Sequence, residues 1–252
     1  MSGSPVTMEK RKIQLFVPCC IDQLYPQTAF HTIQVLEHLG VEVEYSPEQI
    51  CCGQTAFKNG YWDEAKEIGE KFLHDFGSGL PVVCPSASCV GYIKNYYWKL
   101  FFNTGLHLEY RKLRENIYEF TDYIVNVLRV SDTGSTFAHK VTYHDSCTAL
   151  REYGLVEEPR LLLSNVKGLE LVEMEKTSQC CGFGGMFSMG FEPVSVAMTE
   201  QKVNNALATE AEYIVSTDAT CLGNMEAYIK KQKLPIKCMH IADVLAQGLE
   251  KK

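Results

Sequence analysis

Residues 50–54 read Ile-Cys-Cys-Gly-Gln, and the Cys-Cys-Gly triplet returns at residues 180–182. A single cysteine precedes each triplet by about one α/β unit, and another cysteine follows after a similar interval. Equivalent cysteines lie at nearly constant separations: 128 residues from Cys19 to Cys147, 129 from Cys51 to Cys180 and 132 from Cys89 to Cys221. This regularity indicates that the chain contains one unit twice.

The size of the chain agrees with two units of ordinary domain length. The 252 residues are 46% hydrophobic, which is enough for a packed core. We expect residues 1–11 to form a disordered tail, residues 12–135 to form the first repeat and residues 136–252 to form the second. Residues 96–119, rich in aromatic and charged side chains, have no counterpart of equal length and predict an insertion that includes a bridging helix.

Charge and cysteine content limit the classes of function. The net charge of −7 disfavours a nucleic-acid-binding protein, which would carry a basic face. The first eleven residues lack the apolar segment of a secretory signal, and no run of about 18 apolar residues predicts a membrane span. Eleven cysteines in such a chain indicate a reducing compartment. We therefore expect a cytoplasmic protein.

Hydrophobic patterns alternate between strand and helix, which predicts an α/β fold of two repeated three-layer halves with mainly parallel sheets. The loops at the carboxyl ends of the strands would then carry the cysteines at one edge of each sheet. The expected strands are residues 12–17, 41–45, 81–83, 140–143, 169–174, 213–216 and 236–239. The expected helices are residues 28–39, 61–76, a segment from residue 90, 159–166, 194–208, 224–231 and 241–249.

Each repeat brings four thiols to one place, which is typical of a metal or iron–sulfur site. The first set is Cys19, Cys51, Cys52 and Cys89, and the second is Cys147, Cys180, Cys181 and Cys221. Adjacent cysteines bind different irons of one cluster more easily than one tetrahedral zinc, so the pattern favours an iron–sulfur cluster. The alternatives are zinc, disulfide exchange and simple burial of the thiols. Burial explains the three cysteines outside the repeat well: Cys20, Cys84 and Cys238.

Residues beside the cysteines have their own expected roles. Gly53 and Gly182 allow the left-handed backbone that a bulky inorganic centre requires next to a paired cysteine. We expect His144 to hydrogen-bond its loop. The alternative is a proton donor or a supporting group near the cluster. His240 precedes a helix and is expected to be structural, and the aromatic residues 96–98 are expected to serve packing.

With these motifs, the chain resembles the cysteine-rich CCG-domain proteins, which include a cysteine-rich component of heterodisulfide reductase and the iron–sulfur subunit of glycolate oxidase. Stretches such as Phe16-Val17-Pro18-Cys19 and Cys180-Cys181-Gly182-Phe183-Gly184-Gly185 are similar to the lactate utilization type. The family motif ends in Cys-x-x-Cys, and here its first cysteine is replaced by Ser86 in one copy and Asp218 in the other. Either residue could supply an oxygen ligand, or a conventional four-thiolate cluster could form.

The resemblance implies an iron–sulfur subunit of an oxidoreductase complex that oxidises L-lactate to pyruvate, with up to one cluster, expected to be [4Fe-4S], in each half. It also implies partner subunits that resemble lactate utilization proteins B and C. Because no G-x-G-x-x-G follows a strand, we expect no bound flavin or nicotinamide. The alternatives are a thiol–disulfide reductase of the heterodisulfide type and a zinc-binding interaction module.

Overall fold

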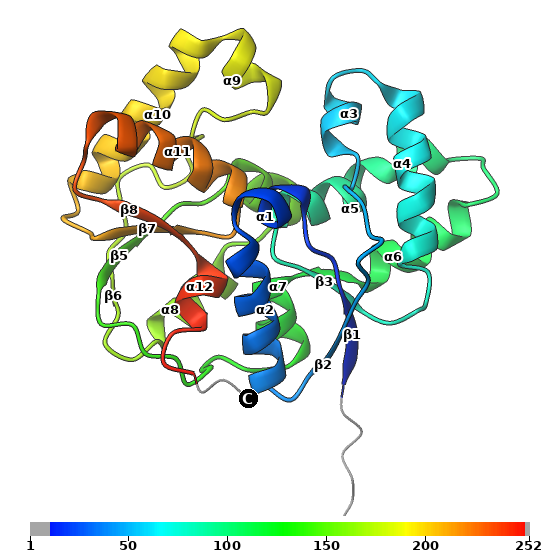
Figure 1. Ribbon diagram of the computed structural model, residues 1–252, viewed down its shortest axis with the longest axis horizontal. Coiled ribbons are helices and arrows are strands. Elements are labelled where there is room, and N and C mark those ends of the chain that lie inside the picture. Colours follow the sequence, from blue (N-terminus) through cyan, green and yellow to red (C-terminus); the bar gives the residue numbers. More distant parts are fainter. Residues whose placement is uncertain (1–10, 250–252) are drawn as a thin grey trace, which may run out of the picture.

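The computed structural model describes residues 11–249 and contains two four-stranded sheets whose neighbouring strands are all parallel (Figure 1). The first sheet has the order β2-β1-β3-β4 and the second has the matching order β6-β5-β7-β8. The strands are β1 (Lys12–Leu15), β2 (Glu42–Tyr45), β3 (Val82–Cys84), β4 (Ile117–Glu119), β5 (Lys140–Tyr143), β6 (Glu170–Leu171), β7 (Tyr213–Ser216) and β8 (Lys237–His240). The predicted α/β fold of two repeated halves is confirmed. Residues 1–10 of the expected tail lie outside the described residues.

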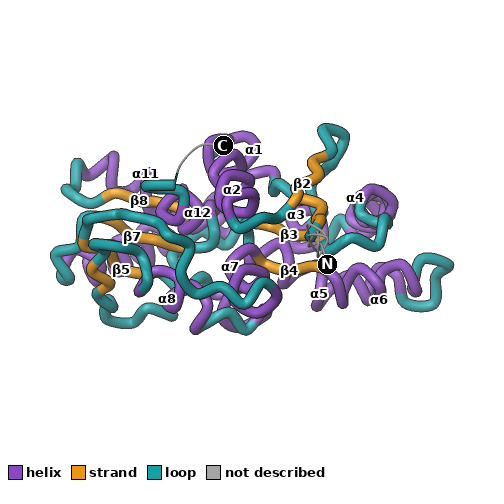
Figure 2. The backbone as a smooth tube through the Cα atoms, turned by 90° about the horizontal axis from the view of Figure 1, so that it is seen from below, coloured by secondary structure: helices purple, strands orange, loops and turns teal. Residues whose placement is uncertain are grey.

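Helices connect the strands and lie on both sides of the sheets (Figure 2). The first half contains α1 (Cys19–Leu24), α2 (Pro26–His38), α3 (Gln54–Lys58), α4 (Trp62–Asp75), α5 (Ala87–Phe101), α6 (His107–Asn116), α7 (Phe120–Asp122) and the π-helix η1 (Tyr123–Val127). The second contains the π-helix η2 (Ala149–Tyr153), α8 (Glu157–Ser164), α9 (Met186–Gly190), α10 (Glu192–Leu207), α11 (Ala219–Gln232) and α12 (Ile241–Leu245). In the described part of the chain, every helix is too short or too polar to cross a lipid bilayer.

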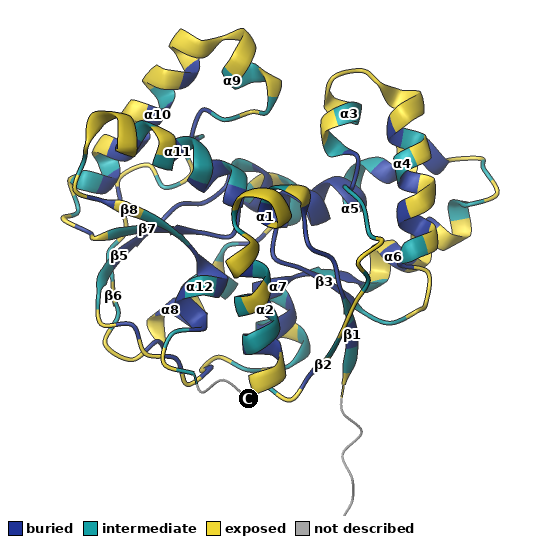
Figure 3. Cartoon of the chain, viewed as in Figure 1, coloured by how far each residue is buried: buried dark blue, intermediate teal, exposed yellow. Residues whose placement is uncertain are grey.

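The two halves share a hydrophobic core. Leu15 and Val83 of the first sheet belong to the same buried cluster as Val141 and Val215 of the second. Helices α2 and α12 pack against each other across the boundary. Figure 3 shows the buried residues along the central strands β1, β3, β5 and β7 and on the inward faces of the helices, with exposed residues on the outer faces of α4 and α10. This arrangement fixes the carboxyl ends of both sheets relative to each other.

Equivalent backbone hydrogen bonds show how closely the halves correspond. The N–H of Phe16 donates to Val83 O at 2.9 Å, and the N–H of His144 donates to Val215 O at 2.8 Å. Phe16 and His144 each stand three residues before the single cysteine of their repeat. Phe16 and His144 therefore occupy equivalent positions, directly after β1 in the first half and after β5 in the second.

Several elements differ from the expected ones at their ends. Strand β7 has the predicted bounds, but the strand expected at 169–174 contains only Glu170–Leu171. Helices α5 and α11 begin at Ala87 and Ala219, earlier than predicted, so Cys89 and Cys221 lie in the first turn of a helix rather than in a loop. Part of the expected insertion at 96–119 forms β4, which takes the place in the first sheet that β8 takes in the second.

Candidate metal centre

All eight cysteines of the repeat line a single cavity of about 770 Å³. The cavity lies at the carboxyl ends of both sheets, where the loops after the strands of the two halves meet. The lining cysteines are Cys19, Cys51, Cys52, Cys89, Cys147, Cys180, Cys181 and Cys221. The two sets, separate along the chain, therefore face one shared space.

Within each set, neighbouring thiols affect one another's pKa in the same order. In the first set, Cys51 interacts with Cys19 and Cys52, and Cys52 interacts with Cys89. In the second set, Cys180 interacts with Cys147 and Cys181, and Cys181 interacts with Cys221. Four soft sulfur donors in contact are the donor set that iron–sulfur clusters and zinc use, so the residues present fit such a group.

The glycine after each cysteine pair adopts the predicted left-handed backbone. The φ angle is +83° at Gly53 and +88° at Gly182, a region that side chains with a Cβ rarely adopt. Each glycine N–H then donates to the sulfur two residues earlier: Gly53 to Cys51 Sγ and Gly182 to Cys180 Sγ, both at 3.4 Å. The tight turn thus presents a backbone dipole to the thiol and stabilises its negative charge.

The thiol contacts change the acidity of the first set. Hydrogen bonds from Cys19 and Cys52 lower the pKa of Cys51 to about 3, with a further contribution from the N–H of Gly53. The hydrogen bond with Cys19 also lowers the pKa of Cys20 to about 7. Since the thiolate is the form that binds metals, the first set contains a sulfur that is ready to bind at neutral pH.

Ser86 and Asp218, which replace the missing cysteines, contact each other across the boundary between the halves. They are the N-cap residues of α5 and α11, and neither side chain caps its own helix. Instead, Asp218 Oδ1 accepts from Ser86 Oγ at 3.1 Å, from Ser88 Oγ at 2.6 Å and from the N–H of Ser88 at 3.3 Å. Within residues 11–249, Oδ2 of the fully buried Asp218 has no hydrogen-bond partner. A buried oxygen of this kind fits a position where it can bind a metal ion directly.

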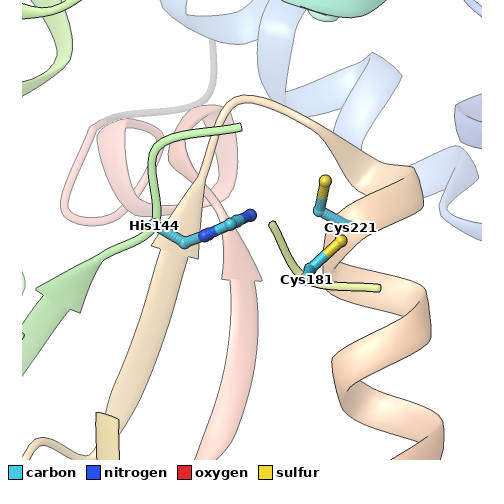
Figure 4. Close-up of side chains that lie close together, drawn as sticks. All are labelled: His144, Cys181 and Cys221. Atoms are coloured by element: carbon cyan, nitrogen blue, oxygen red, sulfur yellow. The ribbon is translucent and has the colours of Figure 1, made fainter. Parts of the chain in front are cut away.

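The expectation that His144 hydrogen-bonds its loop is wrong. His144 is fully buried, and neither ring nitrogen has a hydrogen-bond partner among the described residues. One ring nitrogen and the sulfur atoms of Cys181 and Cys221 lie within 4.8 Å of one another, and Figure 4 shows the ring directed toward both sulfurs. Burial, together with the charge of Lys202, lowers the pKa of His144 well below its usual value, so the ring is neutral. His144 therefore lies beside the second cysteine set, which is where the alternative interpretation of the sequence expected it.

The other single residues have varied outcomes. His240 is structural as predicted, since its Nδ1 accepts from the N–H of Ala242 at the start of α12. Cys84 is buried and its thiol contacts Ser86 O at 3.7 Å. Cys20, expected to be a simple buried cysteine, instead lines the cavity beside Cys19. Its position next to a repeat cysteine was the only signal for this in the sequence.

Comparison with known proteins finds the same cysteine-rich unit once in each half of the chain. The family model described as "Cysteine-rich domain" matches residues 13–94 and 141–226. Lactate utilization protein A of Geobacillus kaustophilus is 39% identical over 234 residues, which cover 93% of this chain and 98% of that protein. Lactate utilization protein A of an Exiguobacterium species is 40% identical over 240 residues, covering 94% and 98%.

A solved structure shares the fold at low sequence identity. The crystal structure of a hypothetical protein from Helicobacter pylori superimposes with a TM-score of 0.61 and 10% identity, over 96% of this chain and 50% of that chain. This similarity concerns the fold alone.

Proposed function

Because the chain belongs to the cysteine-rich CCG-domain family, as a member of the lactate utilization protein A type, we propose that it is an iron–sulfur subunit of an oxidoreductase complex that oxidises L-lactate to pyruvate. The observation that supports this function is the single cavity lined by eight cysteines in two matching sets. Its partners would be subunits resembling lactate utilization proteins B and C, and it would act in the cytoplasm.

Each cysteine set would hold one cluster, and the four thiolates of each set suit the [4Fe-4S] type. Gly53 and Gly182 would leave room for the cluster and direct an N–H toward its sulfur ligands. Asp218 would place its unpartnered Oδ2 between the two sites, while Ser86 holds the carboxylate in position. When bound, such a cluster accepts and releases single electrons.

The test is anaerobic purification followed by measurement of iron, acid-labile sulfide and visible absorbance. We expect a brown protein with iron and sulfide in equal amounts. Cys52→Ser and Cys181→Ser should each remove about half of the iron, because each removes a ligand from one set. Cys238→Ser, outside the cavity, is the matched control and should keep all of it. A colourless protein that contains stoichiometric zinc would contradict the proposal and favour an interaction module.

A thiol–disulfide reductase is the second candidate, favoured by the lining of the cavity. Beyond the cysteines, Gln54 and Lys58 of α3 line it on one side, and Phe183 and Met186 line it on the other. These amide, ammonium and apolar groups could hold a substrate that reaches the clusters. Turnover of a disulfide by the iron-loaded chain with reduced viologen would favour this function, and its absence would leave the electron-carrying function.

A further inference from the structure

The two cysteine sets match, but the side chains that surround them do not. Phe16 and His144 are equivalent by their backbone hydrogen bonds. A Cβ placed on Gly53 would lie 3.4 Å from Ala65 O, and one placed on Gly182 would lie 2.5 Å from Ser195 O, so α4 and α10 pass the paired cysteines in the same register. Seven residues further along these helices, Phe72 of the first half corresponds to Lys202 of the second.

Aromatic side chains surround the first set. Phe16 and Phe72 lie edge to face with ring centroids 4.8 Å apart, and Tyr97 lies 6.0 Å from Phe72. These three rings are almost completely buried and belong to the same cluster as Cys52 and Cys89. The carbonyl of Cys52 accepts a hydrogen bond from the hydroxyl of Tyr97 at 2.8 Å. At these two positions, Phe16 and Phe72, the first set therefore has aromatic rings and no cationic side chain.

Polar groups replace these rings at the second set. The carbonyl of Cys181 accepts from Thr199 Oγ1 at 2.8 Å and from Asn224 Nδ2 at 3.0 Å. His144 stands where the first half has Phe16, with its ring beside the sulfurs. An imidazole ring has at least one N–H in each of its forms, and this N–H could donate to a sulfur atom of a bound cluster.

Lys202 adds a positive charge near the second set, close enough to interact electrostatically with Cys180, Cys181 and Cys221. Its side chain is fully buried, and Nζ donates to the carbonyl oxygens of Lys176 at 3.0 Å and Thr177 at 2.5 Å. Burial lowers its pKa to about 8, so the ammonium keeps its charge at neutral pH. The nearby Asp145 does not cancel this charge, because it forms a two-pronged ion pair with Arg160 at 2.8 and 2.9 Å. The buried carboxylate of Asp218 lies between the halves, and its negative charge acts on Cys20 of the first half as well as on Cys147 of the second. It therefore does not distinguish the two sets as Lys202 does.

Charge and hydrogen-bond donors near an iron–sulfur cluster change its reduction potential. A reduced cluster is more negative than an oxidised one, so a buried ammonium and N–H donors stabilise the reduced form, whereas aromatic surroundings do not. On the basis of the proposed function, we infer that the two centres differ: the one held by the second cysteine set has the higher reduction potential because Lys202 and His144 lie beside it. The second half is then the place where an electron on this chain collects.

The transfer is a simple one-electron step. With both centres bound, the first would lose one electron and be oxidised and the second would gain it and be reduced, with no bond formed or broken and no proton moved. A one-electron donor supplies the first centre, and a one-electron acceptor removes the electron from the second. The opposite direction would be uphill.

The inference is tested by an anaerobic redox titration of the iron-loaded chain, with dithionite as donor and electron paramagnetic resonance as readout. The Cys52→Ser and Cys181→Ser variants assign each signal to a half. We expect the second centre to be reduced first. In Lys202→Met, its reduction equilibrium should weaken at least tenfold, which is 59 mV for one electron, while the first centre stays unchanged.

Two further variants separate charge from packing. Lys202→Arg keeps the charge and should keep the potential, and His144→Phe, which gives the second half the residue of the first, should lower it. Circular dichroism checks the fold of each variant. Equal potentials, a higher potential at the first centre, or equal shifts in Lys202→Met and Lys202→Arg would overturn the inference alone. A chain that binds no iron would overturn the proposed function as well.

Discussion

The equivalent glycines Gly53 and Gly182 should differ greatly in their tolerance of alanine. Both have a positive φ, which costs a residue with a Cβ about 1 kcal/mol. At Gly182 the new Cβ would also lie 2.5 Å from Ser195 O and 3.0 Å from Thr199 Oγ1, so the backbone of α10 must move. Overpacking of this kind adds about 1–3 kcal/mol. At Gly53 the nearest atom is Ile68 Cγ2 at 3.2 Å, the end of a side chain that can shift.

We therefore expect Gly182→Ala to lower the free energy of unfolding by about 2–4 kcal/mol and Gly53→Ala by about 1–2 kcal/mol. Gly60→Ala is the control, because Gly60 has a φ of +85° with nothing within 4 Å of the added Cβ, and it measures the backbone cost alone. The assay is urea unfolding of the metal-free protein followed by far-ultraviolet circular dichroism. Equal losses in the three variants would refute the role of the close approach between Gly182 and α10.

Three other substitutions test the buried polar groups. Burial raises the pKa of Glu119 to about 8, above its ordinary 4.5, so its contribution to stability is complete below pH 4.5 and is lost as the pH rises through 8. Glu119→Gln should remove this loss of stability, which is on the order of a few kcal/mol. The measurement is the melting temperature of both proteins from pH 5 to pH 9. The same dependence of melting temperature on pH in both proteins would contradict the prediction. Arg160→Met leaves Asp145, whose side chain is 6% exposed, without its ion pair. We expect the free energy of unfolding in urea to fall by about 3 kcal/mol. A decrease below about 1 kcal/mol would show that the pair is not required for stability. Tyr97→Phe keeps the ring but removes the donor to Cys52 O, so a loss of about 1–2 kcal/mol is expected, and an unchanged melting temperature would argue against this hydrogen bond.

Periodicity and the repeat were enough to predict the sheets and the gathering of the cysteines. Strand β7 (Tyr213–Ser216) could be predicted directly because it is a short apolar run between turn signals. Helices α1 and α3 were missed because they have six and five residues, too few for a helical face to show in the sequence. The early starts of α5 and α11 were missed although Ser86 and Asp218, the residues before them, are of types preferred at a helix N-cap, because both were interpreted only as replacements for cysteine.

The shared cavity could not be predicted because it depends on how the two sheets are placed relative to each other. The chain pattern shows two sets of four thiols, but the packing of α2 against α12 brings both sets to one space. The position of His144 was hidden for a related reason. A buried histidine is expected to be a satisfied side chain until the neighbours of its ring are known.

The hydrogen bonds between Ser86, Ser88 and Asp218 have a consequence for the evolution of the family. The two positions that differ from the family motif are in contact, so a change at one alters the surroundings of the other. Cysteine at 86 alone would remove one hydroxyl donor from a buried carboxylate, and cysteine at 218 alone would remove the carboxylate that accepts from both serines and leave them only each other. Each replacement thus makes reversal of the other costly, and we expect the two positions to vary together among related chains.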